Sequence, residues 1–377
     1  MKLSVHLVTW NGGKYIPYLF DSLRKQTFKD WRLIILDNAS TDDTLREIKT
    51  EISTFAKATA DKKNFPVEVE LIENKENKGF AGGHNQLFRG TGNKDQGVGE
   101  YVLLLNQDMY LMPDCLEKMV KFMDTHEDVA VVSPRLMRWD FGKCRIENAE
   151  RRIEDSLSNN IDALGLKIFR NRRVIEKYTG KDWSVLEPKM KMSYRAERFN
   201  GDGTALEVFG VSGAFPLYRR AAIEAVKFGD GSFLDESYHS YKEDVDLAFR
   251  LQSAGFKSYV LLDTVAYHDR SAAGPQEMGD SAAVENKKKQ SEWVKYHSYK
   301  NHLMTLYKNE YWQNWLLDAV FIKWYELKKF VWFLLFDRAV LRGWAEIWKN
   351  RKDLKIKRLK IKSLRKVGWR EIRKWWR

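Results

Sequence analysis

Three acidic residues stand close together where a helix is expected to begin: Glu243, Asp244 and Asp246. Apolar residues resume after them at helical spacing, and Gly255 fits the end of that helix. Acidic side chains stabilise a helix N-terminus by about 0.3–1 kcal/mol through the helix dipole, so a purely structural role is one interpretation. The other is catalytic, because a carboxylate beside an attacking hydroxyl can accept its proton as a general base.

Two more polar side chains follow expected strands. The β-branched and aromatic run from 257 to 265 predicts a strand that carries His268 at its tip. Upstream, the apolar run from 101 to 105 leads into a polar turn that ends at Asp108. Such a run is typical of a strand covered on both faces, and ligands of open α/β sheets bind beyond the carboxyl ends of strands. We therefore expect Asp108 to meet a ligand or a ligand-bound metal, with an ordinary turn aspartate as the alternative.

The N-terminal third of the chain predicts the elements that would position these groups. Strand-like and helix-like segments alternate there at a spacing that favours a parallel sheet with right-handed crossovers. Each expected strand ends in small or polar residues, which indicates one shared site along the carboxyl edge of the sheet. The strands are expected at 3–9, 31–36 and 67–72, the helices at 15–26 and 44–55, and a glycine-bearing loop at 77–85.

Six segments, taken in order, resemble those of inverting family 2 glycosyltransferases with a GT-A fold, and specifically the rhamnosyltransferase-type members. The resemblance covers about residues 1–300. It implies an α/β fold with a mostly parallel, Rossmann-like sheet flanked by helices, and transfer of a sugar from a nucleoside diphosphate sugar to a hydroxyl. The chain departs from the family's metal motif at Asn106, where the first acid would stand. The segments are 8–11, 36–42, 77–85, 103–108, 209–214 and 243–247.

The resemblance also implies roles for single residues. Asp244 matches the general base, with Glu243 as the second candidate. Asp108 and His268 match residues that hold a divalent cation, Mg²⁺ or Mn²⁺, on the donor's diphosphate, and an imidazole ligand favours Mn²⁺. A buried, hydrogen-bonded histidine is the alternative for His268. The donor-binding residues that it implies are Thr9, Asn11, Asp37, Ser40, Gly79, Phe80, Gly82, Gly83, Asn85, Asn106, Gln107, Ser212 and Gly213.

Several of these positions have an ordinary structural interpretation as well. Asp37 and Ser40 follow a strand and could cap the next helix. The glycines near residue 80 would bring the backbone close to a nucleotide, or would simply form a flexible turn. Asp246 is expected to support the start of its helix or an arginine such as Arg250.

Residues 139–208 lack a clear periodicity, and we interpret them as an insertion in a catalytic domain that spans 1–300. This insertion would form part of the acceptor site and its lid. Cys115 and Cys144 have no metal or redox spacing, which suits a reducing cytoplasm, and the first strand begins at residue 3, so no secretory signal is expected. The arginines that could meet an anionic acceptor, or lie as solvated surface, are Arg151, Arg152, Arg170, Arg172 and Arg173.

The remaining segment, 301–377, is strongly basic. From 321 onward it holds 19 Lys+Arg against 5 Asp+Glu, a net charge of +14, and 7 of the chain's 14 tryptophans. Basic charge with tryptophan on a helix is typical of an interfacial membrane anchor, and the apolar run at 330–336 is far below the roughly 20 residues that span a bilayer. We expect this tail to lie on the cytoplasmic face of the cell membrane, near a lipid-linked acceptor. The alternatives are a helical hairpin packed on the catalytic domain and a tail that binds nucleic acid.

Three other classes of protein fit the sequence less well. A sugar-1-phosphate nucleotidyltransferase would need a glycine- and arginine-rich phosphate loop after the first strand, and residues 10–15 do not supply it. A non-catalytic carbohydrate- or membrane-binding module has no use for Asp108 and Asp244 together. A Rossmann oxidoreductase needs Gly-X-Gly-X-X-Gly after a strand, which the chain lacks. The sequence therefore favours a glycosyltransferase.

Overall fold

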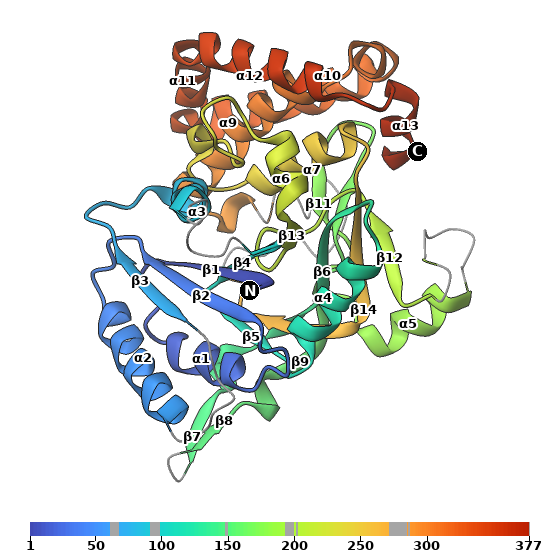
Figure 1. Ribbon diagram of the computed structural model, residues 1–377. Coiled ribbons are helices and arrows are strands. Elements are labelled where there is room, and N and C mark those ends of the chain that lie inside the picture. The colour runs from blue at the N-terminus through green and yellow to red at the C-terminus, as the bar shows by residue number, and fades with distance from the viewer. Residues whose placement is uncertain are drawn as a thin grey trace.

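The computed structural model describes residues 1–60, 68–90, 99–147, 150–192, 200, 203–270, 285 and 287–376. Within these residues one ten-stranded sheet forms the centre of the molecule (Figure 1). Its main path runs through β12 (Ala205–Val208), β14 (Lys257–His268), β6 (Val129–Trp139), β13 (Leu217–Arg219), β4 (Tyr101–Asn106), β1 (Leu3–Thr9), β2 (Trp31–Asp37) and β3 (Val69–Glu73). Two further strands pair beside this path, β5 (Met109–Leu111) with β14 and β9 (Leu157–Ala163) with β6.

The predicted mostly parallel sheet flanked by helices is confirmed. Strands β3, β2, β1 and β4 pair in parallel, and β6 and β14 form a second parallel pair. Strand β13 lies antiparallel between β4 and β6 and joins the two parallel parts. The carboxyl ends of β1, β2 and β4 therefore meet at one edge, because Val8 lies opposite both Leu36 and Asn106.

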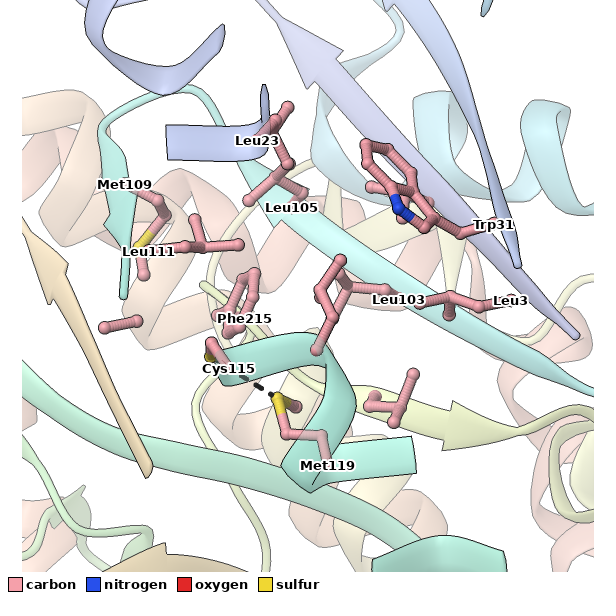
Figure 2. Close-up of a cluster of buried hydrophobic side chains, with 14 of the residues drawn as sticks. Leu3, Leu23, Trp31, Leu103, Leu105, Met109, Leu111, Cys115, Met119 and Phe215 are labelled. Atoms are coloured by element: carbon pink, nitrogen blue, oxygen red, sulfur yellow. Dashed lines mark hydrogen bonds between the residues drawn. The ribbon is translucent and has the colours of Figure 1, made fainter. Parts of the chain in front are cut away.

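Helices cover both faces of the sheet, and the alternation of side chains along β4 explains why. Leu103 and Leu105 belong to the cluster on one face, whereas Val102 and Leu104 belong to the cluster on the other. Figure 2 shows the first cluster, in which these leucines meet Trp31 and Met119. The helices are α1 (Ile16–Arg24), α2 (Thr44–Ala60), α3 (Gly79–Gly90), α4 (Cys115–Thr125), α6 (Arg220–Val226) and α7 (Glu243–Ser253).

The expected glycine-bearing loop at 77–85 is wrong, because α3 begins inside it at Gly79. The Asn77 Oδ1 atom accepts a hydrogen bond from the Gly79 amide at 2.8 Å, which satisfies one of the free N–H groups at this helix start. Further along, a β-carbon at Gly83 would lie 2.9 Å from a methyl group of Val8. The glycine there lets α3 pack directly on β1, so packing and not flexibility explains its presence.

The segment 139–208, interpreted above as an insertion, contributes two strands to the central sheet, and its role in the acceptor site stays a prediction. β9 and β12 are both strands of that sheet, and the short strands between them explain why no long periodicity is visible in the sequence. Its other elements are β7 (Arg145–Glu147), β8 (Glu150–Arg152), β10 (Leu166–Ile168), β11 (Val174–Glu176), α5 (Trp183–Met192) and the 3₁₀ turns η2 (Phe141–Lys143) and η3 (Glu154–Ser156).

The C-terminal helices pack on the rest of the protein, above α6 and α7 in Figure 1. They are α9 (Glu292–Asn309), α10 (Trp312–Phe336), α11 (Gly343–Lys349), α12 (Arg351–Leu364) and α13 (Trp369–Arg373), with the 3₁₀ turns η5 (Arg338–Arg342) and η6 (Lys374–Trp376). Helix α9 runs across residue 300 without a break. None of the helices in the described ranges is both long and apolar enough to span a membrane.

Two of the five arginines considered above hold this packing together. The buried Arg172 binds Glu310 at 2.7 Å and Asp318 at 3.1 Å, and Arg170 binds Asp318 at 2.6 Å. Arg172 is therefore a buried structural residue, whereas Arg170 is paired with Asp318 but remains partly exposed. The sequence could not show these pairs because the partners lie about 140 residues away. The side chains of Arg151 and Arg152 lie outside the described residues.

Candidate active site

A cleft of about 510 Å³ opens at the carboxyl ends of β4 and β14 and extends between α7, α9 and α10. It brings together residues that lie up to about 250 positions apart in the sequence, from Phe80 to Phe333. Part of its wall comes from the C-terminal segment, through Tyr325, Lys329 and Phe333 of α10. Eight of the predicted site residues line it: Phe80, Asn106, Asp108, Ser212, Gly213, Glu243, Asp244 and His268.

Asp108 and His268 face each other at one end of this cleft. Asp108 lies in the turn between β4 and β5, and His268 ends β14, which pairs antiparallel with β5. The His268 Nε2 atom lies 3.4 Å from Asp108 Oδ1, and its Nδ1 atom lies 2.9 Å from Asp162 Oδ2. Although burial lowers the pKa of His268, the carboxylates of Asp108 and Asp162 outweigh it and raise that pKa to about 10. The ring is thus held from one side while its other nitrogen faces Asp108.

Three charged residues around His268 were not identified in the sequence: Asp162, Glu176 and Arg270. Arg270 lies 2.9 Å from Glu176 Oε1 and 3.6 Å from Asp162 Oδ1, so it joins the two carboxylates behind the histidine. These two carboxylates raise the pKa of Arg270 although burial lowers it. Arg270 could have been identified from the sequence, because it follows His268 by two residues, and residues two apart in an extended chain point to the same side. Asp162 and Glu176 come from short strands that carry no motif.

Glu243 and Asp244 begin α7 and lie in the same cleft. The Gly213 amide donates a hydrogen bond to Asp244 Oδ2 at 3.3 Å, and the Val245 amide donates one to Oδ1 at 2.7 Å. Glu243 is 7% exposed, and its Oε2 atom has no hydrogen-bond partner among the described residues. Burial, assisted by the negative charge of Asp244, raises the pKa of Glu243 to about 8. At neutral pH Glu243 therefore holds a proton, whereas a base must be free of one.

Glu243 should also make the protein less stable as the pH rises. Its pKa rises from the usual 4.5 to about 8 on folding, so between these values the folded protein binds a proton that the unfolded chain releases. The free energy of unfolding then decreases with increasing pH. Replacing Glu243 with glutamine fixes the neutral state, so the variant should gain stability over the wild type between pH 5 and pH 8, by thermal unfolding. A difference that does not change with pH would contradict the raised pKa.

The segment before α7 adopts a strained backbone. Three residues other than glycine have positive φ angles there: His239 at 62°, Tyr241 at 73° and Lys242 at 72°. Each such residue costs on the order of 1–3 kcal/mol and persists only where its surroundings enforce it. The buried Asn301 of α9 does so, since its Nδ2 atom donates to the carbonyl groups of residues 238, 240 and 241 at 2.7–3.0 Å. The C-terminal helices thus fix the backbone that presents the two acids.

The expected pairing of Asp246 with Arg250 is confirmed, at 3.1 Å between buried side chains. Asp246 also accepts from Lys308 at 2.9 Å and from Asn309 at 2.7 Å, both in α9. The negative charge of Asp246 is therefore balanced by partners that hold α7 against α9, and Asp246 does not line the cleft. This agrees with its assignment as a supporting residue.

Four of the predicted donor-binding residues form one hydrogen-bonded cluster at the ends of β1 and β2. Thr9 donates to Asp37 Oδ1 at 3.2 Å, and the Ser40 hydroxyl donates to the same atom at 2.5 Å. The Asn11 amide donates to Ser40 Oγ at 3.0 Å. The structure brings these residues together as expected, next to the cleft's edge of the sheet but not in its lining. Their contact with a nucleotide stays a prediction.

The remaining predicted donor-binding residues make contacts within the protein, and their contact with a donor stays a prediction. The amide of Gln107 exchanges two hydrogen bonds with the backbone of Trp10, at 2.9 and 3.0 Å. The amide of Asn85, 1% exposed, accepts from the backbone of residues 233 and 234 and donates back to residue 234. Gly79, Gly82 and Gly83 lie in α3, outside the lining of the cleft.

Comparison with known proteins agrees with this geometry. The protein is 26% identical over 258 residues to a GalNAc(5)-diNAcBac-PP-undecaprenol beta-1,3-glucosyltransferase of Campylobacter jejuni, which covers 64% of this chain and 72% of the relative. It is 25% identical over 278 residues to an N-acetylglucosaminyl-diphospho-decaprenol L-rhamnosyltransferase of Mycobacterium tuberculosis, covering 72% and 78%. Another relative, EpsE of Bacillus subtilis, is 30% identical over 139 residues, and the match spans 44% of its length and 37% of this chain.

A crystal structure of GalNAc-T7 with UDP, GalNAc and Mn²⁺ has the same fold, with a TM-score of 0.51 and 12% identity over 82% of this chain and 48% of that one. The GT-A architecture expected from the sequence is thereby confirmed. The model of glycosyl transferase family 2 matches residues 4–226, which include both β4 and the cluster at the ends of β1 and β2. This protein is a glycosyltransferase, and it belongs to glycosyl transferase family 2.

Proposed function

We propose that the enzyme transfers a sugar, with inversion, from a nucleoside diphosphate sugar to a hydroxyl group of a glycan acceptor. The observation that carries this is the single cleft in which Asp108 and His268 lie at one end and Asp244 lies beside Gly213. The end with Asp108 and His268 suits the donor's diphosphate, and Asp244 suits the attacking hydroxyl. Release of nucleoside diphosphate, dependent on both a donor sugar and an acceptor, tests the proposal, and its absence with every donor would contradict it.

Asp244 is the residue that we assign as general base. The acceptor oxygen attacks the anomeric carbon, its proton passes to an oxygen of Asp244, and the bond from that carbon to the diphosphate breaks. The amides of Gly213 and Val245 orient this carboxylate. Glu243 retains its proton at neutral pH and leaves Asp244 as the only negative charge of the pair. Ser212 and Gly213 then border the space for the donor sugar.

The residues at the other end fit a divalent cation. Carboxylate and imidazole are a donor set suited to Mn²⁺, and the hydrogen bond of His268 Nδ1 to Asp162 is the outer contact that orients a metal-binding histidine. Within the described ranges, no group of three or more His, Cys, Asp or Glu side chains is placed to hold a metal. Phosphate oxygens and water would complete the coordination. When bound, the cation would neutralise the charge that develops on the leaving diphosphate.

The names of the relatives support a choice of substrates. Two of them, from C. jejuni and M. tuberculosis, are named for transfer of glucose and of L-rhamnose to sugars on diphospho-polyprenols. We propose an acceptor of this lipid-linked kind, as used to build cell-surface polysaccharide, and L-rhamnose as the first donor sugar to test.

We further propose that α10 binds the cytoplasmic surface of an anionic membrane. The buried side of this helix carries three polar residues, Asn314, Asp318 and Lys329, beside two apolar ones, whereas its exposed side is mostly apolar. Tryptophan beside basic residues suits the headgroup region of a bilayer, and the basic C-terminal segment attracts anionic lipid. The outer face of α10 consists of residues that are 60–78% exposed: Trp312, Leu316, Val320, Trp324, Leu335 and Phe336.

Glutamate at both Val320 and Trp324 should reduce sedimentation with anionic vesicles at least about tenfold, because two charges would enter the apolar headgroup boundary. Substitution is preferable to truncation within α10, which would remove the buried partner of Arg172, Asp318. The control is Val185→Glu in α5, an exposed apolar residue far from α10 (Figure 1). Unchanged sedimentation of the double variant would contradict the proposal, and so would dimers or nucleic-acid complexes that form through this face without vesicle binding.

A further inference from the structure

Three of the cations that line the cleft come from different elements, apart from the pair of Asp108 and His268. Arg173 precedes β11, Lys242 precedes α7, and Lys329 comes from the inner side of α10. We call Arg173, Lys242 and Lys329 the acceptor-side cations. They come from three separate parts of the chain and meet only through the fold, so no sequence motif marks them.

Two of the acceptor-side cations have no carboxylate partner. Among the described residues no ion pair involves Arg173 or Lys242, and the Lys242 amino group makes one long hydrogen bond, 3.4 Å to the Val174 carbonyl. Lys329 is 8% exposed and lies 3.5 Å from both oxygens of Glu326, at the limit of hydrogen bonding. Lys329 is thus buried with a distant partner, whereas Arg173 and Lys242 are half-buried without an ion pair. Poorly paired charges in a cleft are costly, and they are retained where a ligand supplies the opposite charge.

The three cations also act on one another. Burial lowers the pKa of Lys329 although Glu326 raises it, and the positive charges of Lys242 and Arg173 add to the lowering. Burial likewise lowers the pKa of Lys242 although Asp244 and Glu176 raise it, and Arg270 and Arg173 add to the lowering. The three cations therefore lie close enough to repel one another, and an anion bound between them would reduce that repulsion.

We propose that the acceptor-side cations form a binding site for the phosphate group of a lipid-linked acceptor. Lys329 connects this site to the membrane, because it lies on the inner side of the helix whose outer face is apolar. A phosphate held there would leave its apolar chain along α10 and direct its sugar toward Asp244. This inference rests on the proposed function and adds the residues that recognise the acceptor.

The two phosphate sites of the cleft differ in chemistry, and this difference makes the inference testable. At the donor end the facing groups are a carboxylate and an imidazole, so a diphosphate there needs a divalent cation. At the acceptor-side cations the groups are already positive, so a phosphate needs none. Binding of a lipid phosphate should therefore persist in EDTA and in the presence of a saturating nucleoside diphosphate.

Geranyl diphosphate is a suitable soluble probe, with geraniol as the control that lacks phosphate. We expect the full-length protein to bind geranyl diphosphate, but not geraniol, in EDTA by calorimetry. Lys329→Met and Arg173→Gln should each weaken this binding about tenfold or more, the loss expected for one charge-assisted hydrogen bond. Lys323→Gln removes an equal charge from the exposed side of α10 and should leave binding unchanged. Thermal unfolding of each variant checks its fold.

Nucleoside diphosphate binding with Mn²⁺ is measured in parallel. It separates the proposed donor site from the proposed phosphate site at the acceptor-side cations. Retained geranyl diphosphate binding without nucleotide binding would refute the proposed donor site and leave the acceptor-side cations standing. Binding of geranyl diphosphate that requires Mn²⁺, or that a nucleoside diphosphate displaces, would place it at the donor end and overturn the inference. Equal affinity in Arg173→Gln, Lys329→Met and Lys323→Gln would overturn it as well.

Discussion

Replacing Asp108 with asparagine should reduce sugar transfer at least about 100-fold, the usual cost of losing one electrostatic group that stabilises a leaving oxyanion. The carboxylate is the only acid that faces the cleft side of His268 among the described residues, since Asp162 holds the ring from its other nitrogen. The amide side chain keeps the shape of the turn between β4 and β5. Initial rates of nucleoside diphosphate release, with Mn²⁺ and with EDTA, measure the effect.

Asp263→Asn provides the matched control, because this exposed aspartate lies on the same strand as His268 but outside the cleft. Its carboxylate lies 3.7 Å from the Lys118 amino group and accepts a hydrogen bond from the neighbouring Thr264 hydroxyl at 3.2 Å. Its rate should equal that of the wild type. Full activity of the wild type in EDTA, or of Asp108→Asn in Mn²⁺, would show that neither a cation nor this carboxylate serves the reaction.

Replacing Asp244 with asparagine should lower the turnover number by about 10²–10⁴-fold, which is the range that general base catalysis contributes. Gly213 and Val245 donate to different oxygens of Asp244, so the single oxygen of asparagine can keep the shorter of these hydrogen bonds, from Val245, but not both. The shape of the side chain is nevertheless preserved, so donor binding should be retained. Calorimetry with the donor and steady-state kinetics together separate loss of binding from loss of proton transfer.

Glu243→Gln is the comparison that decides the assignment of the base. Since Glu243 is already protonated at neutral pH, its glutamine variant should retain most of its turnover. A larger loss in Glu243→Gln than in Asp244→Asn would transfer the role of base to Glu243. Loss of donor binding in Asp244→Asn would instead give this residue a role in holding the donor.

The strands and helices that carry the acids were predictable from the sequence. The run from 101 to 105 is fully apolar and forms β4 with both faces buried, and the strand from 257 delivers His268 at its end as expected. Here local composition and tertiary burial agree, so a strand pattern read from single residues was sufficient. The start of α7 at Glu243 was predictable for the same reason.

The segment at 77–85 shows where such reasoning fails. Three glycines among nine residues resemble a loop, because glycine is a poor helix former. Contact with Val8 and with the backbone of His239 nevertheless requires glycine at two of these positions, and the packing of α3 outweighs the weak local preference. The requirement for glycine at these positions thus comes from neighbours that are distant in the sequence.

The residues that surround the site could not be predicted from the sequence either. Asp162 and Glu176 approach His268 and Arg270 through pairings of short strands, at separations of about 100 residues. The C-terminal segment carried a clear signal in its charge and tryptophan content, yet its packing depends on buried pairs such as Arg172 with Asp318. The C-terminal segment packs on the catalytic part, as one of the alternatives expected. The exposed face of α10 is apolar, and membrane binding stays a proposal.

Calorimetric titration with a panel of nucleoside diphosphate sugars, with and without Mn²⁺, tests the central claim most directly. We expect at least one donor to bind to the wild type with Mn²⁺, and its affinity to fall at least about tenfold in EDTA. Asp108→Asn should show the weak affinity under both conditions. Asp244→Asn should bind like the wild type. Donor binding that is equally tight in EDTA and in Asp108→Asn would contradict the claim that this cleft is a metal-dependent donor site.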